Sequence, residues 1–160
     1  MFKRLLVWDL DETIIDSKHR TPNNPDGTLN LQRYFELKTR ENIFRDSLLP
    51  LASVFKSLCR VQNYIAICTA RVMNQDDYDF LDANGISAHS ILCRPENGSE
   101  NKIPDAELKA IKIQRLWLEN DFHKLPTYMW DDSKPVISKM RQIGVRCINA
   151  KTVNERMKRA

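Results

Sequence analysis

The chain has 160 residues, of which 42% are hydrophobic and 29% are charged, and its formal net charge is +4. This length fits one domain that can bury a sizeable core, and the composition excludes wholesale disorder. No apolar run is long enough for a membrane span or a signal peptide, so we expect a cytoplasmic protein with no membrane partner. The mild positive charge fits a phosphate-bearing partner and an ordinary solvated surface equally well.

The four cysteines predict no metal site. Cys59, Cys68, Cys93 and Cys147 are widely spaced and lie in apolar contexts. None of them forms half of a typical zinc motif with a neighbouring Cys or His. We therefore expect reduced cysteines that pack in the core.

The first recognisable element is an apolar run at residues 5–8 that ends at Asp9 and Asp11, within the sequence Leu-Leu-Val-Trp-Asp-Leu-Asp-Glu-Thr. Such a run suits a strand buried on both faces of a parallel sheet, and ligands of these sheets bind beyond the carboxyl ends of the strands. Alternation along the strand would point both carboxylates at one site, where a divalent cation or a shared proton relieves their repulsion. The alternative is a strand that merely ends in a polar turn, where Asp is common.

Residues 16–46 predict a small flap and not a large cap domain. The stretch Pro22–Gly27 is a loop, because it is rich in residues that neither a helix nor a strand tolerates. Residues 29–42 then regain a helical pattern. His19 and Arg20 would lie where a cation could meet an anionic ligand, although an exposed polar turn explains them about as well.

From residue 49 onward, helical and strand patterns alternate. We predict helices over residues 49–59, 75–84, 105–120 and 134–143, and strands over residues 64–68, 90–93, 127–130 and 145–149. This alternation predicts an α/β fold with a doubly wound, Rossmann-like parallel sheet and helices on both faces. Residues 1–150 would form the domain, and residues 151–160 a basic tail that is helical or frayed.

Polar groups follow the strand predicted over residues 64–68. Thr69, Ala70 and Arg71 would place a hydroxyl and free backbone N–H groups at the sheet edge where Asp9 lies. Groups of this kind bind phosphate oxygens well. The sequence therefore predicts an anion site next to the carboxylates.

A second acidic pair, Asp131 and Asp132, follows a later strand and would bring further oxygen ligands for Mg²⁺ to the same edge. The helix before that strand carries Lys109 and Lys112, which are three residues apart and share a face. Either lysine could point a cation at the site. Solvated lysines are the default interpretation of such a helix.

The order Asp-x-Asp-x-Thr, Thr, Lys, Asp-Asp resembles the haloacid dehalogenase (HAD) superfamily of phosphotransferases, over nearly the whole chain. The resemblance implies an HAD-like fold and a Mg²⁺-dependent phosphatase with an aspartyl-phosphate intermediate. It implies roles for the motif residues as follows: nucleophile for Asp9, general acid and then base for Asp11, phosphate binding for Thr69 and Lys112, and metal binding for Asp9, Asp11, Asp131 and Asp132.

The two catalytic aspartates need different protonation states. Phosphoryl transfer requires an in-line nucleophile and neutralisation of the charge on the phosphoryl oxygens. We expect crowding and partial desolvation to favour protonated Asp11, while Asp9 stays ionised by holding the metal.

Within the superfamily the chain is most similar to the 3′-phosphatase domain of bacteriophage polynucleotide kinase/phosphatase and to related small phage-type nucleotide phosphatases. The similar stretches include Thr69-Ala-Arg, Cys93-Arg-Pro-Glu-Asn-Gly and Trp130-Asp-Asp. This similarity implies a nucleotide or a 3′-phosphate end of nucleic acid as substrate. The sequence shows no sign of an obligate protein partner. Residues expected to bind it are His19, Arg20, Thr69, Ala70, Arg71, Arg94 and Lys112, with Tyr34 and Phe35 as candidates for stacking.

Two alternatives remain open at this point. Glu12 stands where phosphatases of this group usually have glycine, and Asp-Leu-Asp-Glu-Thr instead resembles protein serine/threonine phosphatases. A catalytically idle HAD-fold binding protein is the other alternative, which the intact acidic set disfavours because unpaired carboxylates cost stability without a metal.

Overall fold

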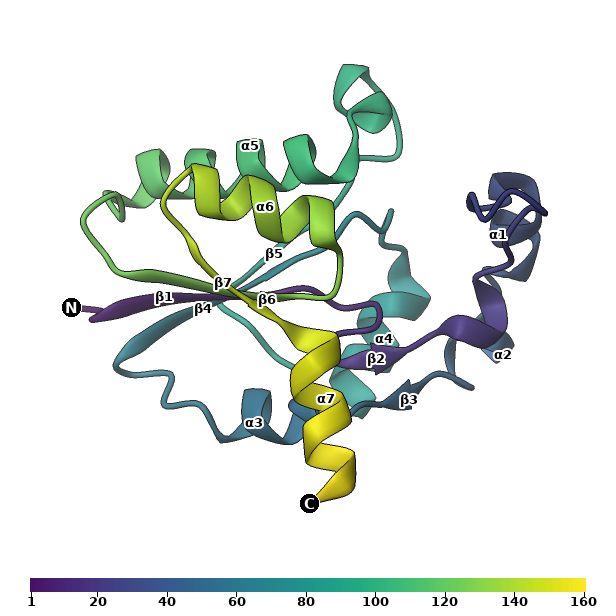
Figure 1. Cartoon of the computed structure of the whole chain (residues 1–160), viewed down its shortest axis with the longest axis horizontal. Coiled ribbons are helices and arrows are strands. Elements are labelled where there is room, and N and C mark those ends of the chain that lie inside the picture. The colour runs from purple at the N-terminus through teal and green to yellow at the C-terminus, as the bar shows by residue number, and fades with distance from the viewer.

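A computed structural model describes residues 1–160 and contains a central parallel sheet of five strands in the order β5-β4-β1-β6-β7 (Figure 1). The strands are β1 (Arg4–Trp8), β4 (Asn63–Cys68), β5 (Ser90–Leu92), β6 (Thr127–Asp131) and β7 (Arg146–Asn149). Every pairing in this sheet is parallel, with β1 in the centre between β4 and β6. The predicted α/β fold with a parallel sheet is thereby confirmed.

Helices cover both faces of the sheet, as the view onto the edge of the sheet shows (Figure 1). One face packs against α5 (Asp105–Asn120) and α6 (Lys134–Gln142), and the other against α3 (Leu51–Ser57), α4 (Gln75–Ala83) and α7 (Ala150–Arg159). None of the helices is both long and apolar enough to cross a membrane.

The central strand β1 supplies both hydrophobic cores. Leu5 and Val7 pack in the core below α5 and α6, whereas Leu6 and Trp8 pack in the core on the opposite face. This division follows from the alternation of side chains along a strand, and it explains the unbroken apolar run. The indole of Trp8 stacks on that of Trp130 with ring centroids 4.0 Å apart, which holds the ends of β1 and β6 in register.

The segment predicted as a flap, residues 16–46, projects from the carboxyl end of the sheet (Figure 1). A two-stranded antiparallel ribbon of β2 (Ile15–Asp16) and β3 (Ser47–Leu48) joins it to the domain. Between them lie a 3₁₀ helix at Lys18–Arg20 and two helices, α1 (Leu31–Leu37) and α2 (Arg40–Ile43).

The structure differs from the single helix expected over residues 29–42. Lys38 leaves the helical conformation, and the Thr39 hydroxyl accepts a hydrogen bond from the N–H of Asn42 and so caps a new helix, α2.

Strands β2 and β3 were not predicted from the sequence. Each has only two residues, too few to show the alternation of apolar and polar residues that indicates a strand.

The cysteines are all free, but they are not all in the core. Cys68 and Cys147 are buried, Cys93 is half-buried and Cys59 is exposed. Burial raises the pKa of the Cys68 thiol to about 12, so this residue is a packing group and not a nucleophile.

The C-terminal residues form a docked helix, α7, and its buried residue Asn154 ties three parts of the fold together. The side-chain oxygen Oδ1 of Asn154 accepts a hydrogen bond from the N–H of Leu51, at the start of α3, at 2.9 Å. Its amide group donates to the carbonyl of Thr13 at 2.9 Å. Because Thr13 belongs to the loop after β1, α7 supports the loop that carries the acidic motif.

We expect Asn154→Leu to lower the free energy of unfolding by roughly 2–4 kcal/mol, because it leaves two buried backbone groups without partners. Denaturant unfolding would measure the change. Lys151→Ala, on the exposed side of the same helix, is the matched control and should stay within about 0.5 kcal/mol of wild type. Equal stabilities of the two variants would contradict this account of α7.

Candidate active site

The carboxyl ends of three adjacent strands bring the acidic motifs together. Asp9 follows β1, Thr69 follows β4, and Asp131 is the last residue of β6. The chain leaves β1 for β4 on one side and returns to β6 on the other, so β1 marks the topological switch point of the sheet. Ligands of open α/β sheets bind at this position.

Three carboxylates form the centre of the site. Ligand oxygens of Asp9, Asp131 and Asp132 all lie within 4.8 Å of one another. Asp9 and Asp131 are buried, and Asp131 also accepts a hydrogen bond from the N–H of Ser133 at 2.9 Å. A hard divalent cation such as Mg²⁺ prefers oxygen donors of this kind, so these residues fit a metal.

Lys109 reaches the carboxylates of the site, and Lys112, which we expected from the sequence to bind phosphate, does not. The Lys109 ammonium lies 2.8 Å from Asp9 Oδ1 and 2.7 Å from Asp131 Oδ2. Lys112 instead pairs with Glu100 at 2.8 Å. The physical reason is the geometry of α5, which begins near the carboxyl edge of the sheet and runs back along it, so three residues carry Lys112 about 4.5 Å away from that edge.

The acidic cluster holds more negative charge than one lysine neutralises. Burial raises the pKa of Asp9 well above its usual range, with Lys109 opposing the shift and Asp131 adding to it. Burial and the neighbouring Asp131 raise the pKa of Asp132 to about 6. Burial disfavours charged Lys109, but Asp9 and Asp131 outweigh this effect and raise its pKa. A dication would relieve the remaining repulsion.

Asp11 lies apart from this cluster and is held in its ionised form. The Arg71 guanidinium donates to both of its oxygens, at 2.5 and 3.2 Å, and the Ser17 hydroxyl donates at 2.5 Å. Burial opposes ionisation, but Arg71 and Ser17 lower the pKa of Asp11 to about 2. This result differs from the expected protonated Asp11, because a bidentate guanidinium stabilises the carboxylate.

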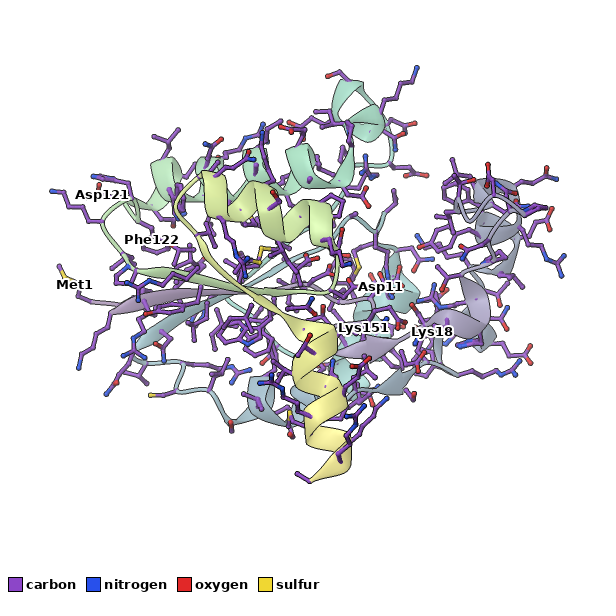
Figure 2. The ribbon with its side chains drawn as sticks, in the orientation of Figure 1. Met1, Asp11, Lys18, Asp121, Phe122 and Lys151 are labelled. Atoms are coloured by element: carbon purple, nitrogen blue, oxygen red, sulfur yellow. The ribbon has the colours of Figure 1, made fainter.

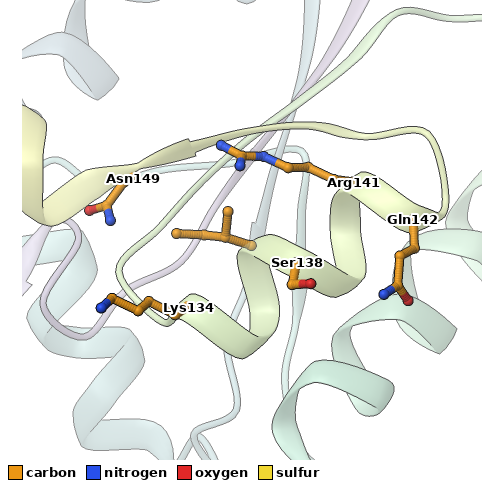
Figure 3. Close-up of a pocket in the computed structure, with 6 residues that line it drawn as sticks. Lys134, Ser138, Arg141, Gln142 and Asn149 are labelled. Atoms are coloured by element: carbon orange, nitrogen blue, oxygen red, sulfur yellow. The ribbon is translucent and has the colours of Figure 1, made fainter.

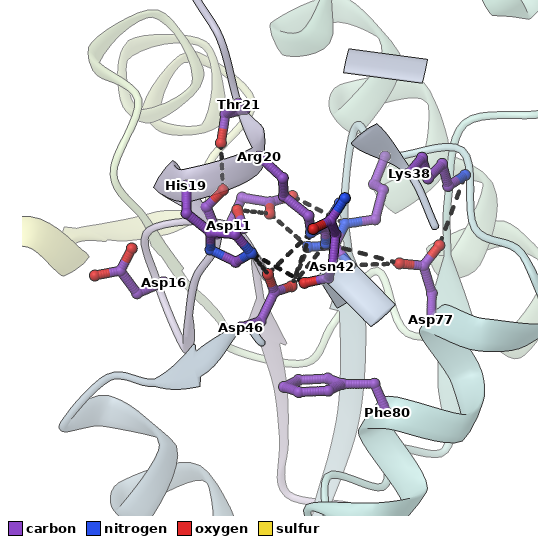
Figure 4. A network of polar contacts seen from close by, with 12 residues as sticks. Asp11, Asp16, His19, Arg20, Thr21, Lys38, Asn42, Asp46, Asp77 and Phe80 are labelled. Carbon is purple, nitrogen blue, oxygen red and sulfur yellow. Dashed lines mark hydrogen bonds and ion pairs between the residues drawn. The ribbon is translucent and has the colours of Figure 1, made fainter. Parts of the chain in front are cut away.

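A buried ionic network joins Asp11 to the flap (Figure 4). Arg71 also donates to Asp77 at 2.7 Å, and Lys38 of the flap lies 3.6 Å from the same carboxylate. Arg20, at the base of the flap, pairs with Asp46 at 2.7 Å and lies 3.9 Å from Asp77. No short-range pattern in the sequence could have revealed these pairs, since most join residues more than 25 positions apart.

Two flap cations expected to bind substrate serve the flap itself. Arg20 is only 1% exposed, and its guanidinium forms an ion pair with Asp46. The Nε2 atom of His19 forms a hydrogen bond with the carbonyl of Asn42 at 2.9 Å, and it lies 3.6 Å from Asp46. Neither residue lines the site pocket.

The remaining predicted substrate residues except Lys112 line the pocket, but two of them, Arg71 and Arg94, point their charges inward. Arg94 donates to the carbonyls of Ala70 and Ile103 and pairs with Asp105 at 2.7 Å, which organises the loop before α5. Arg71 is held by its carboxylate partners. Thr69 lies at the pocket floor, where its hydroxyl oxygen accepts from the N–H of Arg71 at 3.1 Å.

The pocket is a cavity of about 660 Å³ between the sheet edge, the flap and the loop before α5. Its floor includes Asp9, Asp11, Glu12, Thr69, Lys109 and Asp132, the flap contributes Leu29, Leu31, Tyr34 and Phe35, and the loop contributes Arg94, Asn101 and Lys102. Figure 2 places Asp11 at the end of the sheet that faces the flap. The pocket thus has a charged floor and an apolar wall.

A second hollow of about 480 Å³ lies along α6 and β7, lined by Lys134, Ile137, Ser138, Arg141, Gln142 and Asn149 (Figure 3). It contains no carboxylate, and Arg141 is already bonded to the carbonyl of Cys147 at 3.0 Å. It therefore offers neither a nucleophile nor metal ligands.

The fold of this sheet is shared with HAD-type hydrolases of known structure. A putative HAD hydrolase from Bacillus subtilis, solved with bound magnesium, superposes with a TM-score of 0.61 at 14% identity, over 92% of this chain and 88% of that one. A chain of the Pnkp1/Rnl/Hen1 RNA repair complex superposes with a TM-score of 0.65 at 20% identity, over 92% of this chain but only 42% of that one. These similarities show the fold.

The family follows from the sequence itself. The model of the family described as "Bacteriophage T5 5′-deoxynucleotidase" matches residues 1–160, so the chain belongs to this family. The 5′-deoxynucleotidase of Escherichia phage T5 is 29% identical, over 95% of this chain and 69% of the phage protein. The resemblance to HAD phosphatases is thereby confirmed, and the chain is a hydrolase of the phosphatase class.

We expect Lys109→Met to reduce kcat/KM by about 10²-fold or more, as the loss of a charge that stabilises the transition state does. Lys112→Met, on the same helix, should retain activity close to wild type. Steady-state phosphate release would measure both, with thermal melts to verify that each variant folds. The prediction is wrong if Lys112→Met is the more damaging change.

Proposed function

We propose that the chain is a Mg²⁺-dependent phosphomonoesterase that removes the 5′-phosphate of deoxynucleoside monophosphates through an aspartyl-phosphate on Asp9. The observation that carries the proposal is the placement of Asp9 at the floor of a nucleotide-sized pocket, in contact with Lys109 and beside Asp131 and Asp132. The name of the phage T5 relative supports this class of substrate.

In the first step, Asp9 attacks phosphorus, and the bond from phosphorus to the nucleoside oxygen breaks. Lys109, Thr69 and the backbone beyond β4 would neutralise the phosphoryl oxygens. A magnesium ion bound by Asp9, Asp131 and Asp132 would add further charge stabilisation.

Asp11 is placed to manage the protons. A bound phosphate adds negative charge beside it and so favours its protonated form, which can give a proton to the leaving nucleoside oxygen. In the second step, water attacks the aspartyl-phosphate. The Asp11 carboxylate, oriented by Arg71 and Ser17, takes the proton of that water and phosphate is released.

Two features favour a mononucleotide over a nucleic acid end. Leu31 and Phe35 line the pocket with 61% and 56% of their surfaces exposed, so they offer an apolar face to a nucleobase. The arginines predicted to hold additional phosphates, Arg20, Arg71 and Arg94, instead form ion pairs with aspartates of the protein itself. The pocket is thus suited to one phosphate and one base.

We expect Mg²⁺ to raise the melting temperature by about 5–10 °C at a concentration of about 100 Kd. The pKa of Asp132 is raised from 3.8 to about 6. The folded protein is therefore more stable at low pH, where Asp132 is protonated, and it loses this stability as the pH rises through about 6. The stabilisation by Mg²⁺ should therefore be larger at pH 7.5 than at pH 5.

Melts of Asp132→Asn provide the test of this assignment. The variant should melt at a higher temperature than metal-free wild type at pH 7.5, because one repulsive charge is gone, and should respond little to Mg²⁺. A full response of the variant to Mg²⁺ would contradict the role of Asp132 in metal binding.

Phosphate release from a substrate panel tests the function. We expect 5′-deoxynucleoside monophosphates to exceed 3′-phosphorylated oligonucleotides and phosphoserine peptides in kcat/KM by at least about tenfold. Asp9→Asn is isosteric and should be inactive while keeping its fold, and rapid quenching of wild type should trap phosphate on Asp9. A preference for the oligonucleotide or the peptide would overturn the proposed substrate.

A further inference from the structure

Glu12 adopts a backbone conformation that disfavours its own side chain. Its φ angle is 58°, in the left-handed region, and only Asp121 among the other non-glycine residues has a positive φ. The turn after β1 imposes this conformation, because the N–H of Glu12 donates to the carbonyl of Ile15 at 2.8 Å. Glycine would fit without strain, so a larger residue here indicates a use for the side chain.

The Glu12 side chain lines the site pocket and leaves one oxygen without a partner. Oε2 pairs with Lys18 at 2.9 Å, whereas Oε1 is buried and has no hydrogen-bond donor. A buried oxygen without a donor is costly, and such atoms are rare in folded proteins. Since a carboxylate only accepts hydrogen bonds, the missing group is a donor such as a hydroxyl.

The charges around Glu12 exclude a second phosphate at this place. Glu12 and Asp132 are both acidic pocket residues, and the charge of Glu12 contributes to the raised pKa of Asp132. The nearest cation of the flap, Lys18, is the partner of Glu12 itself. An additional phosphate beside Glu12 would therefore meet like charge.

We propose that Glu12 is the specificity-determining residue that reads the sugar of the substrate. This inference rests on the proposed function, because it takes the phosphate at Asp9 to be a nucleoside 5′-phosphate. Among the sugar hydroxyls of such a substrate, the 3′-hydroxyl is separated from the ester oxygen by the fewest covalent bonds. The Glu12 carboxylate, which is 27% exposed at the pocket, accepts a hydrogen bond from this hydroxyl, and its charge rejects substrates that carry a 3′-phosphate or a 3′-linked strand.

The test compares three substrates: a 5′-deoxynucleoside monophosphate, its 2′,3′-dideoxy analogue, and the 3′,5′-bisphosphate. Wild type should prefer the monophosphate to the dideoxy analogue by about tenfold or more in kcat/KM, because a polar site rejects an analogue that lacks its hydroxyl. In Glu12→Gly this ratio should fall close to one. Glu12→Gln keeps an acceptor oxygen but loses the charge, so it should retain part of the ratio and gain activity on the bisphosphate.

Two control variants separate specificity from strain and general charge. Asp121→Gly relieves the other positive φ angle at the far end of the molecule from Asp11 (Figure 2), and Glu41→Gln removes an exposed carboxylate of the flap. Both should keep the wild-type substrate ratios. Thermal melts of each variant would show that the comparison is made between folded proteins.

Each outcome has a distinct meaning. If wild type hydrolyses 5′-nucleotides but its monophosphate to dideoxy ratio is unchanged in both Glu12→Gly and Glu12→Gln, the role of Glu12 is overturned and the proposed function stands. If wild type hydrolyses an aryl phosphate but no 5′-nucleotide, the proposed function fails and the Glu12 inference fails with it.

Discussion

The contact of Lys109 with both Asp9 and Asp131 is the interaction on which the site depends. These two aspartates belong to adjacent strands whose parallel pairing forces their carboxylates to the same edge. Without a cation between them, their burial would be prohibitive. Lys109 comes from α5, on the face opposite α3 and α7, so the ammonium also fixes how that helix meets the end of the sheet. Stability and the proposed chemistry therefore use the same ionic contacts.

The second organising feature is the network through Arg71 and Asp77. It shares one set of buried charges among Asp11, the start of α4 and the base of the flap. A flap of two short helices and a two-residue ribbon has little core of its own, so these ion pairs are what anchor it. The orientation of Asp11 and the position of the flap are consequently linked through Arg71.

The pocket combines features that point in the same direction about substrate. Its charged floor suits a single phosphate, its flap wall is apolar, and the arginines that could have held additional phosphates are used inside the protein. The departure at Glu12, which suggested a protein phosphatase from the sequence, is compatible with a nucleotidase when the carboxylate is viewed as part of the pocket. The same residue type thus has different implications depending on what surrounds it.

The sequence by itself determined the α/β fold and the positions of Asp9, Asp131 and Asp132 at one edge, because strand periodicity and parallel pairing are local rules that fix where the strand ends lie. The family of phosphatases followed from the resemblance of the motif order to that of known phosphatases. It also singled out the two lysines of α5. Only the tertiary structure showed that Lys109 and not Lys112 contacts Asp9 and Asp131, that Arg20 and Arg94 pair with internal carboxylates, and that Arg71 lowers the pKa of Asp11. These outcomes depend on which charged residue, far away in the sequence, lies within a few ångströms of each side chain in the fold. No local sequence pattern encodes the Coulomb and hydrogen-bond energies of such contacts.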